Sequence, residues 1–163
     1  MSEISAATQY LTFTLAEEVY AVDVGRVREI LEISSITKVP QSPEFMRGVI
    51  NLRGNVVPVI DMRVKFGMSA TERTINTCII VVEVKMGDEV VILGSLADSV
   101  QEVIEMEPSQ IEAAPHLGTQ LNTSFIKGMG KHDDRFVIIL DVDRIFSSGE
   151  LDAVKGEAFQ EAA

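Results

Sequence analysis

The chain repeats one pattern of apolar segments and special residues in its two halves. In each half a predicted hairpin leads to a strand, a proline, a glycine-terminated motif (FMRG or FIKG) and a second hairpin that ends in aspartate. Gly48 and Asp61 lie 13 residues apart, as do Gly128 and Asp141, and a phenylalanine follows each aspartate five residues later. Such equal spacing indicates an internal duplication. It predicts two five-stranded units packed side by side, each copy closing a small barrel of its own.

The apolar segments between turn residues have the composition of β-strands. They are rich in valine and isoleucine, as in INTCIIVVEV and RFVIIL, and turn-forming residues separate them. Short helices are expected only at the connections DMRVKFG, DVDRIFSS and PSQIEAA, and Asp61 and Asp141 are suited to cap the first two. The sequence therefore predicts an all-β fold, as small barrels or a sandwich, with short helical connections.

The two ends of the chain lack the repeated pattern. Residues 1–8 carry no periodicity and are expected to be a flexible N-terminus. Residues 149–163 form an acidic tail in which Leu151, Val154 and Phe159 recur at loosely helical spacing. Two alternatives stay open for this tail, a short docked helix or a mobile segment.

Composition narrows the location and the class of partner. No basic stretch followed by an apolar run opens the sequence, and no window approaches about 18 continuous apolar residues, so neither a signal peptide nor a membrane span is expected. The single cysteine, Cys78, cannot form a disulfide within the chain, and a cytoplasmic location is expected. The net charge of −11 disfavours nucleic acid and anionic membranes as partners, because both need lysine and arginine to neutralise phosphate.

Basic residues are concentrated in one region despite the overall acidity. Arg47, Arg53, Arg63 and Lys65 lie within a short stretch whose only acid is Asp61. A local basic region in an acidic protein suits an acidic protein partner, although the overall acidity by itself also serves solubility.

Candidate catalytic groups are few. His116 and His132 fall in polar, loop-like stretches without the spacing of a zinc site, and no phosphate-binding glycine loop or serine nucleophile motif occurs. Asp61 and Asp141 could serve as paired carboxylates, but their equivalent positions after matched strands favour helix capping. An enzyme that uses Asp61 or Cys78 is the alternative from a different class. No metal or cofactor is expected.

Comparison of the two copies separates residues that the fold demands from residues free for another role. Gly48 and Gly128 match, and we interpret both as structural positions of close backbone approach. Arg53 has no counterpart, because the second copy has Asp133 at the matching place. Strand alternation would point Arg53 away from its barrel core, either as a solvated hairpin residue or as a fork-shaped donor for a partner carboxylate.

Glu29 shares a predicted strand face with the apolar residues Val27 and Leu31. An acid among apolar side chains must reach solvent, a salt-bridge partner or another protein. The sequence leaves these three possibilities open.

The stretches VDVGRVREI and GVINLRGNVVPVIDM resemble the CheW-like domain family, which contains the coupling proteins of bacterial chemotaxis and the regulatory domain of the kinase CheA. In the second half, ADSVQEV is similar to the family's VDxVxxV stretch and departs from it at Ala97. The resemblance covers residues 9–148 and implies a single CheW-like domain. The fold it implies is two SH3-like five-stranded β-barrel subdomains packed around a shared hydrophobic core.

The resemblance also implies a function. It implies a non-enzymatic adaptor that couples the cytoplasmic tips of methyl-accepting chemoreceptors to the histidine kinase CheA in membrane-associated arrays, without inserting into the membrane. A paralogue serving a chemosensory system other than motility is the alternative within the family. A groove between the two barrels would accept an amphipathic helix. The positions that match the family's receptor- and kinase-binding motifs are Val27, Glu29, Gly48, Asn51, Leu52, Arg53, Gly54, Val100 and Val103.

Overall fold

The computed structural model describes residues 7–33, 35–113 and 124–155. His116, Phe159 and most of both predicted termini lie outside these residues. The strands of the described part are β1 (Thr8–Leu15), β2 (Glu18–Asp23), β3 (Val27–Glu32), β4 (Met46–Leu52), β5 (Asn55–Asp61), β6 (Cys78–Met86), β7 (Glu89–Ala97), β8 (Ser99–Met106), β9 (Ile111–Glu112), β10 (Ile126–His132) and β11 (Arg135–Leu140). The helices are η2 (Val24–Arg26), α1 (Met62–Lys65), η3 (Pro108–Gln110), η4 (Val142–Arg144) and α2 (Ser148–Lys155).

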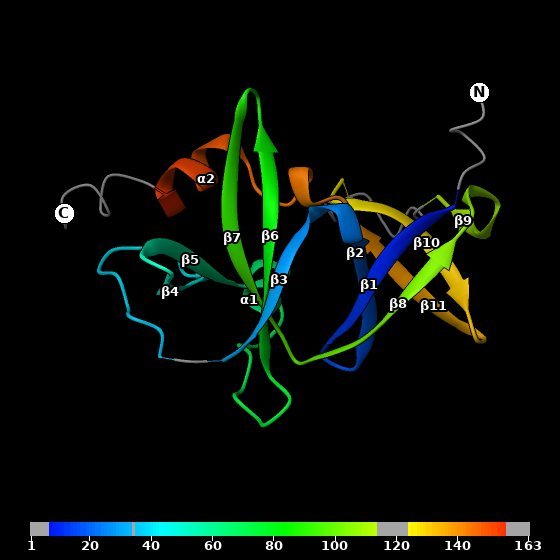
Figure 1. Cartoon of the computed structure of the whole chain (residues 1–163), viewed down its shortest axis with the longest axis horizontal. Coiled ribbons are helices and arrows are strands. Elements are labelled where there is room, and N and C mark those ends of the chain that lie inside the picture. Colours follow the sequence, from blue (N-terminus) through cyan, green and yellow to red (C-terminus); the bar gives the residue numbers. More distant parts are fainter. Residues whose placement is uncertain (1–6, 34, 114–123, 156–163) are drawn as a thin grey trace.

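The strands form two curled sheets that lie side by side (Figure 1). Sheet I has the order β8-β1-β2-β11-β10-β9, and sheet II has the order β3-β6-β7-β5-β4. The two orders coincide when each strand is replaced by its counterpart in the other copy, apart from the short β9. Each sheet also contains a parallel pair, β2 with β11 and β7 with β5. The predicted all-β class with two packed β subdomains is confirmed.

The expectation that each copy closes a barrel of its own is wrong. Hairpin β1–β2 of the first copy lies in sheet I with β8, β10 and β11 of the second copy, and hairpin β6–β7 lies in sheet II with β3, β4 and β5. The cause is the connection after each hairpin. Only the short η2 separates β2 from β3, and only Asp98 separates β7 from β8, so the chain passes directly into the other sheet and cannot turn back. The two copies therefore exchange their first hairpins.

Gly48 and Gly128 occupy equivalent irregular positions in β4 and β10. The ladders β4–β5 and β10–β11 both shift register immediately before the glycine. A Cβ atom at Gly48 would lie 2.2 Å from the carbonyl oxygen of Thr37, and one at Gly128 would lie 2.9 Å from the carbonyl oxygen of Glu112. The predicted close backbone approach is confirmed at both positions.

Asp61 and Asp141 cap the short helices that follow β5 and β11. The Asp61 carboxylate accepts a hydrogen bond from the backbone N–H of Arg63 (3.2 Å), and the Asp141 carboxylate accepts one from the backbone N–H of Asp143 (3.1 Å). The helix-capping interpretation of the aspartate pair is confirmed.

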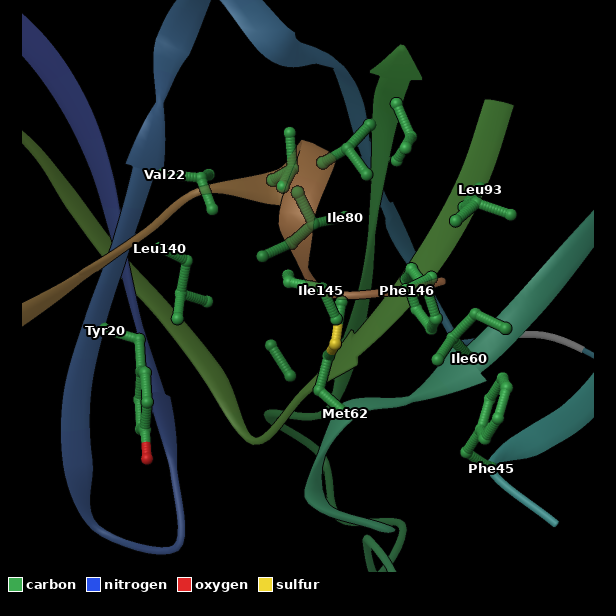
Figure 2. Packing of buried hydrophobic residues seen from close by; sticks show 14 of the residues in the cluster. Tyr20, Val22, Phe45, Ile60, Met62, Ile80, Leu93, Leu140, Ile145 and Phe146 are labelled. Atoms are coloured by element: carbon green, nitrogen blue, oxygen red, sulfur yellow. The ribbon is translucent and has the colours of Figure 1, made fainter. Parts of the chain in front are cut away.

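A shared hydrophobic core lies between the two sheets (Figure 2). Phe45 of the first copy packs against Phe146 of the second with 5.5 Å between ring centroids, and Phe66 stacks on Phe125 at 4.6 Å. Because Phe45 corresponds to Phe125 and Phe66 to Phe146, the two contacts are counterparts. Each copy thus contributes aromatic surface to the other, which holds the subdomains together.

Helix α2 is part of this core. Leu151 and Val154 are fully buried in it, and the Glu150 carboxylate lies 3.4 Å from Nζ of Lys65. For residues 148–155 the docked alternative is therefore the observed one.

Two ion pairs tie the subdomains together at counterpart places. Arg26, next to β3, donates to Asp143 of η4, which also accepts from the backbone N–H of Lys85 (2.7 Å). The Arg26 hydrogen bond lowers the pKa of Asp143. On the other side, Arg63 of α1 donates to Asp98 between β7 and β8 at 3.0 Å. Each pair joins the short helix that follows the last strand of one copy to the connection between the two sheets. Both pairs therefore fix the relative orientation of the sheets.

Candidate partner-binding site

A groove opens in sheet II where β5 and β7 separate. These strands pair in parallel only from Val59–Gly94 to Asp61–Leu96. Hairpins β4–β5 and β6–β7 diverge from there (Figure 1), which leaves a groove of about 830 Å³. Its lining consists of Arg28, Glu29, Leu52, Arg53, Asn55, Val56, Val57, Pro58, Val81, Glu89, Val90, Val91 and Ile92.

The floor of the groove is apolar, and its rim exposes apolar side chains. Val57 and Val81 are buried beneath it. Val56 and Val90, at the starts of β5 and β7, are 59% and 53% exposed. Exposed valines around a concave apolar floor are typical of an interaction site rather than of an ordinary solvated surface. This groove lies within one sheet, and the groove expected between the two barrels stays a prediction.

An ion pair between Glu29 and Arg53 crosses one end of the groove. Glu29 lies on β3 and Arg53 directly follows β4, and these two strands are the edges of sheet II. The Arg53 side chain is 70% exposed and that of Glu29 is 27% exposed. An ion pair this open to solvent contributes only about 0–1 kcal/mol to stability. Of the possibilities for Glu29, the structure shows the salt bridge, and it leaves much of the guanidinium accessible.

Arg53 does not continue β4, so strand alternation does not determine its direction. Arg53 and Gly54 form the two-residue turn of the β4–β5 hairpin, with φ angles of 51° and 88°. Asp133 and Asp134 form the matching turn of β10–β11 with φ angles of 53° and 65°. The predicted correspondence of Arg53 with Asp133 is confirmed, and the tip position explains the exposure of the arginine.

Asn51 and Gly54 shape this turn. The side-chain oxygen of Asn51 accepts a hydrogen bond of 2.8 Å from the backbone N–H of Gly54. Gly54 tolerates its positive φ without a Cβ penalty. Leu52 precedes the turn and lines the groove. The NLRG motif therefore builds a rigid platform that presents Arg53.

The other predicted site residues do not lie in the groove. Val27 is half-buried against the shared core, and Gly48 is buried beneath the segment around Thr37. Val100 packs against the shared core, whereas Val103 on β8 of sheet I is 52% exposed. The structure thus brings together Glu29, Asn51, Leu52, Arg53 and Gly54 and separates the remaining four.

Sheet I repeats the site with different charges. Glu102, the counterpart of Glu29, lies 3.8 Å from Nε2 of His132, and Asp133 lies 3.4 Å from the same nitrogen. Phe136, the counterpart of Val56, is 53% exposed, and Val103 is 52% exposed. At the turn of its second hairpin, sheet I carries Asp133 and Asp134 where sheet II carries Arg53 and Gly54.

Sequence reasoning missed Arg28, Val56 and Val90. Arg28 pairs with Glu83 at 2.8 Å on the groove rim. Val56 and Val90 belong to apolar runs and gave no sign of exposure. The signal that could have found them was position, because each valine is the second residue after a two-residue turn, where a curled strand can leave its sheet.

The groups of the alternative enzyme hypothesis lie in structural settings. Asp61 is 2% exposed and accepts hydrogen bonds from Arg47 Nη2 (2.8 Å), Thr71 N (2.9 Å) and Thr71 Oγ1 (2.7 Å). Burial alone would raise its pKa, but these hydrogen bonds outweigh burial and the pKa is lowered. Burial raises the pKa of the Cys78 thiol, which disfavours the reactive thiolate.

No cluster of histidine, cysteine, aspartate or glutamate suited to a metal ion occurs in residues 7–33, 35–113 and 124–155. Within the same ranges, no helix has both the length and the apolar character needed to cross a membrane.

The chain has two packed β subdomains and a solvent-exposed groove with an apolar floor and charged residues at its rim. These features define a protein-interaction module. The family model of the CheW-like domain matches residues 9–150. The chain is 36% identical to chemotaxis protein CheW of Klebsiella aerogenes, over 92% of this chain and 88% of that protein. It is 35% identical to chemotaxis protein CheW of Helicobacter pylori, over 84% and 80%. The chain belongs to the CheW-like domain family.

A solved structure agrees with this assignment. The scaffolding protein TtCheW from Thermoanaerobacter tengcongensis superposes with a TM-score of 0.77 at 36% identity, covering 89% of this chain and 91% of TtCheW. Family, relatives and fold together give the chain the role of a chemotaxis adaptor.

Proposed function

We propose that this adaptor couples the cytoplasmic tips of chemoreceptors to the histidine kinase CheA, and that the groove of sheet II binds one of these two partners. The observation that carries the proposal is the groove itself. Five of the nine residues predicted for partner binding converge on it or on the turn beside it, although they come from two separate parts of the chain. An apolar floor with an exposed arginine at its end suits an acidic, amphipathic protein surface.

The second partner would bind sheet I. Val103 and Phe136 are exposed there, and the neighbouring carboxylates differ in sign from Arg53. Because the two sheets lie side by side and carry different charges, each can select a different partner, and both partners can be held at once. In this arrangement the chain is cytoplasmic and is recruited to receptor arrays at the membrane through its partners.

The variant Arg53→Glu tests the groove. The reversed charge faces Glu29 and repels an acidic partner, so binding of a receptor tip fragment or of the CheA regulatory domain should weaken about tenfold or more. The melting temperature should stay within a few degrees, because the exposed ion pair contributes about 0–1 kcal/mol. Isothermal titration calorimetry and thermal unfolding measure the two effects.

The chain offers a matched control for Arg53. Arg144 is 68% exposed and pairs with Asp141 at 3.5 Å, away from the residues that line the groove. Arg144→Glu should leave both affinities unchanged. The double variant Arg53→Glu with Glu29→Arg restores the ion pair, so recovered binding would show that the pair acts only on local structure. Unchanged binding of both fragments by Arg53→Glu would remove Arg53 from the site.

A further inference from the structure

The two strands that flank the groove have unpaired edges facing each other. Strand β7 is paired with β6 along its whole length, but with β5 only from Gly94 onward. Strand β5 is paired with β4 from Asn55, but with β7 only from Val59 onward. The first halves of β5 and β7 therefore border the groove as strand edges inside a sheet.

The hairpin registers determine which backbone groups point into the groove. In a hairpin with a two-residue turn, the residues next to the turn form a hydrogen-bonded pair, and the backbone groups of every second residue then point to the opposite edge. Met86 pairs with Glu89 next to the β6–β7 turn, so Val90 and Ile92 direct their N–H and C=O groups toward β5.

The same counting applies to β5. Leu52 pairs with Asn55 next to the β4–β5 turn, so Val56 and Pro58 direct their backbone groups toward β7. Proline has no N–H and is confined to strand positions where no ladder hydrogen bond is needed. The presence of Pro58 at a groove-facing position therefore agrees with an edge that the chain itself leaves open.

We propose that the groove binds an extended segment of a partner by strand addition along the open edge of β7, rather than a helix. The segment pairs with the backbone of Val90 and Ile92, in the half of β7 that β5 leaves uncovered. A helix has no free backbone groups to offer this edge, whereas a strand satisfies it. The inference rests on the proposed function, since it specifies what the partner-binding groove receives.

The side chains around the groove define the chemistry of the segment. Val56 and Val90 are exposed and can pack against alternate apolar side chains of an added strand. The ion pairs Arg53–Glu29 and Arg28–Glu83 lie at the groove rim, and in both the basic side chain is more exposed than the acidic one. The exposed fractions are 70% for Arg53 against 27% for Glu29, and 55% for Arg28 against 27% for Glu83. The segment therefore alternates apolar residues and carries a carboxylate at the end that meets Arg53.

The variants Val90→Pro and Val90→Ala separate backbone recognition from side-chain contact. Because the N–H of Val90 points away from β6, proline removes this donor without breaking the β6–β7 ladder, and alanine keeps the donor while shortening the side chain. Binding of the CheA regulatory domain or of a receptor tip fragment, whichever is weakened by Arg53→Glu, should fall about tenfold or more for Val90→Pro and about threefold for Val90→Ala. Melting temperatures check that both variants fold.

Amide hydrogen exchange on the unmodified chain gives a second measurement, which holds even if the proline variant unfolds. Strand addition to β7 predicts that the amides of Val90 and Ile92 exchange at least about tenfold more slowly when the partner fragment is bound. Equal losses of affinity for proline and alanine, or unchanged exchange at these amides in the complex, would overturn strand addition and leave the partner assignment intact. Failure of the unmodified chain to bind either fragment would instead overturn the proposed function, and the inference with it.

Discussion

Replacing Gly48 with alanine is expected to destabilise the fold by about 3 kcal/mol or more. The φ angle of 153° is one that residues with a side chain rarely adopt. The new Cβ atom would also meet the backbone oxygen of Thr37 at 2.2 Å, so backbone must move. That movement would strain the two hydrogen bonds between Thr37 and Val49, of 2.9 and 2.8 Å. Urea unfolding monitored by circular dichroism measures the loss.

Gly54→Ala is the matched control for this variant. Gly54 also has a positive φ, of 88°, but no atom lies within 4 Å of the position that the alanine methyl group would take. The cost should be limited to the left-handed backbone, about 1–2 kcal/mol. Equal losses for the two variants would contradict the steric argument, since only Gly48 is enclosed.

The expected instability of Gly48→Ala would also lower the apparent affinity for partners. Gly48 and Val27 match family positions associated with partner contact, yet neither lines the groove. Loss of binding by Gly48→Ala should therefore follow the fraction of unfolded protein. Binding measured per folded molecule should remain close to that of the unmodified chain.

The duplication was the most informative feature of the sequence because its spacing depends on local geometry. A register shift before glycine and a capping aspartate after the next strand are set by neighbouring residues, so Gly48, Asp61 and their counterparts could be predicted. Which hairpin pairs with which strands depends on contacts far apart in sequence. For that reason the exchange of β1–β2 and β6–β7 between the copies could not be predicted from apolar pattern alone.

The groove was partly predictable for a similar reason. Glu29 and Arg53 each stood out as a charge in an apolar stretch, but their pairing requires sheet II to curl until its edges meet. Val56 and Val90 were indistinguishable from buried strand residues, because their exposure comes from the divergence of β5 and β7. Periodicity specifies the faces of a strand and does not specify where two neighbouring strands separate.

Asp61→Ala is expected to lower the free energy of unfolding by about 3–5 kcal/mol. Asp61 is 2% exposed, and its loss leaves the hydroxyl and N–H of Thr71 without their acceptor and leaves the Arg47 guanidinium without its carboxylate partner, so that Nη2 keeps the Thr71 carbonyl oxygen as acceptor. Asp141→Ala is the matched control. The Asp141 side chain is 32% exposed, caps η4 and lies 3.5 Å from Arg144, so its loss should cost about 1 kcal/mol.

The acid dependence of stability tests the same site without the cavity that an alanine at position 61 would leave. The pKa of Asp61 is lower in the folded chain than the ordinary value, because burial raises it less than the hydrogen bonds from Thr71 and Arg47 lower it. The unfolded chain therefore takes up the proton first as the pH falls. The contribution of Asp61 should be complete above about pH 4 and should be lost as the pH falls further through the folded-state pKa.

The stability difference between the unmodified chain and Asp61→Asn should accordingly be large at pH 7 and shrink toward pH 3. A difference that does not change over this range would show that the carboxylate charge is not what Arg47 and Thr71 stabilise.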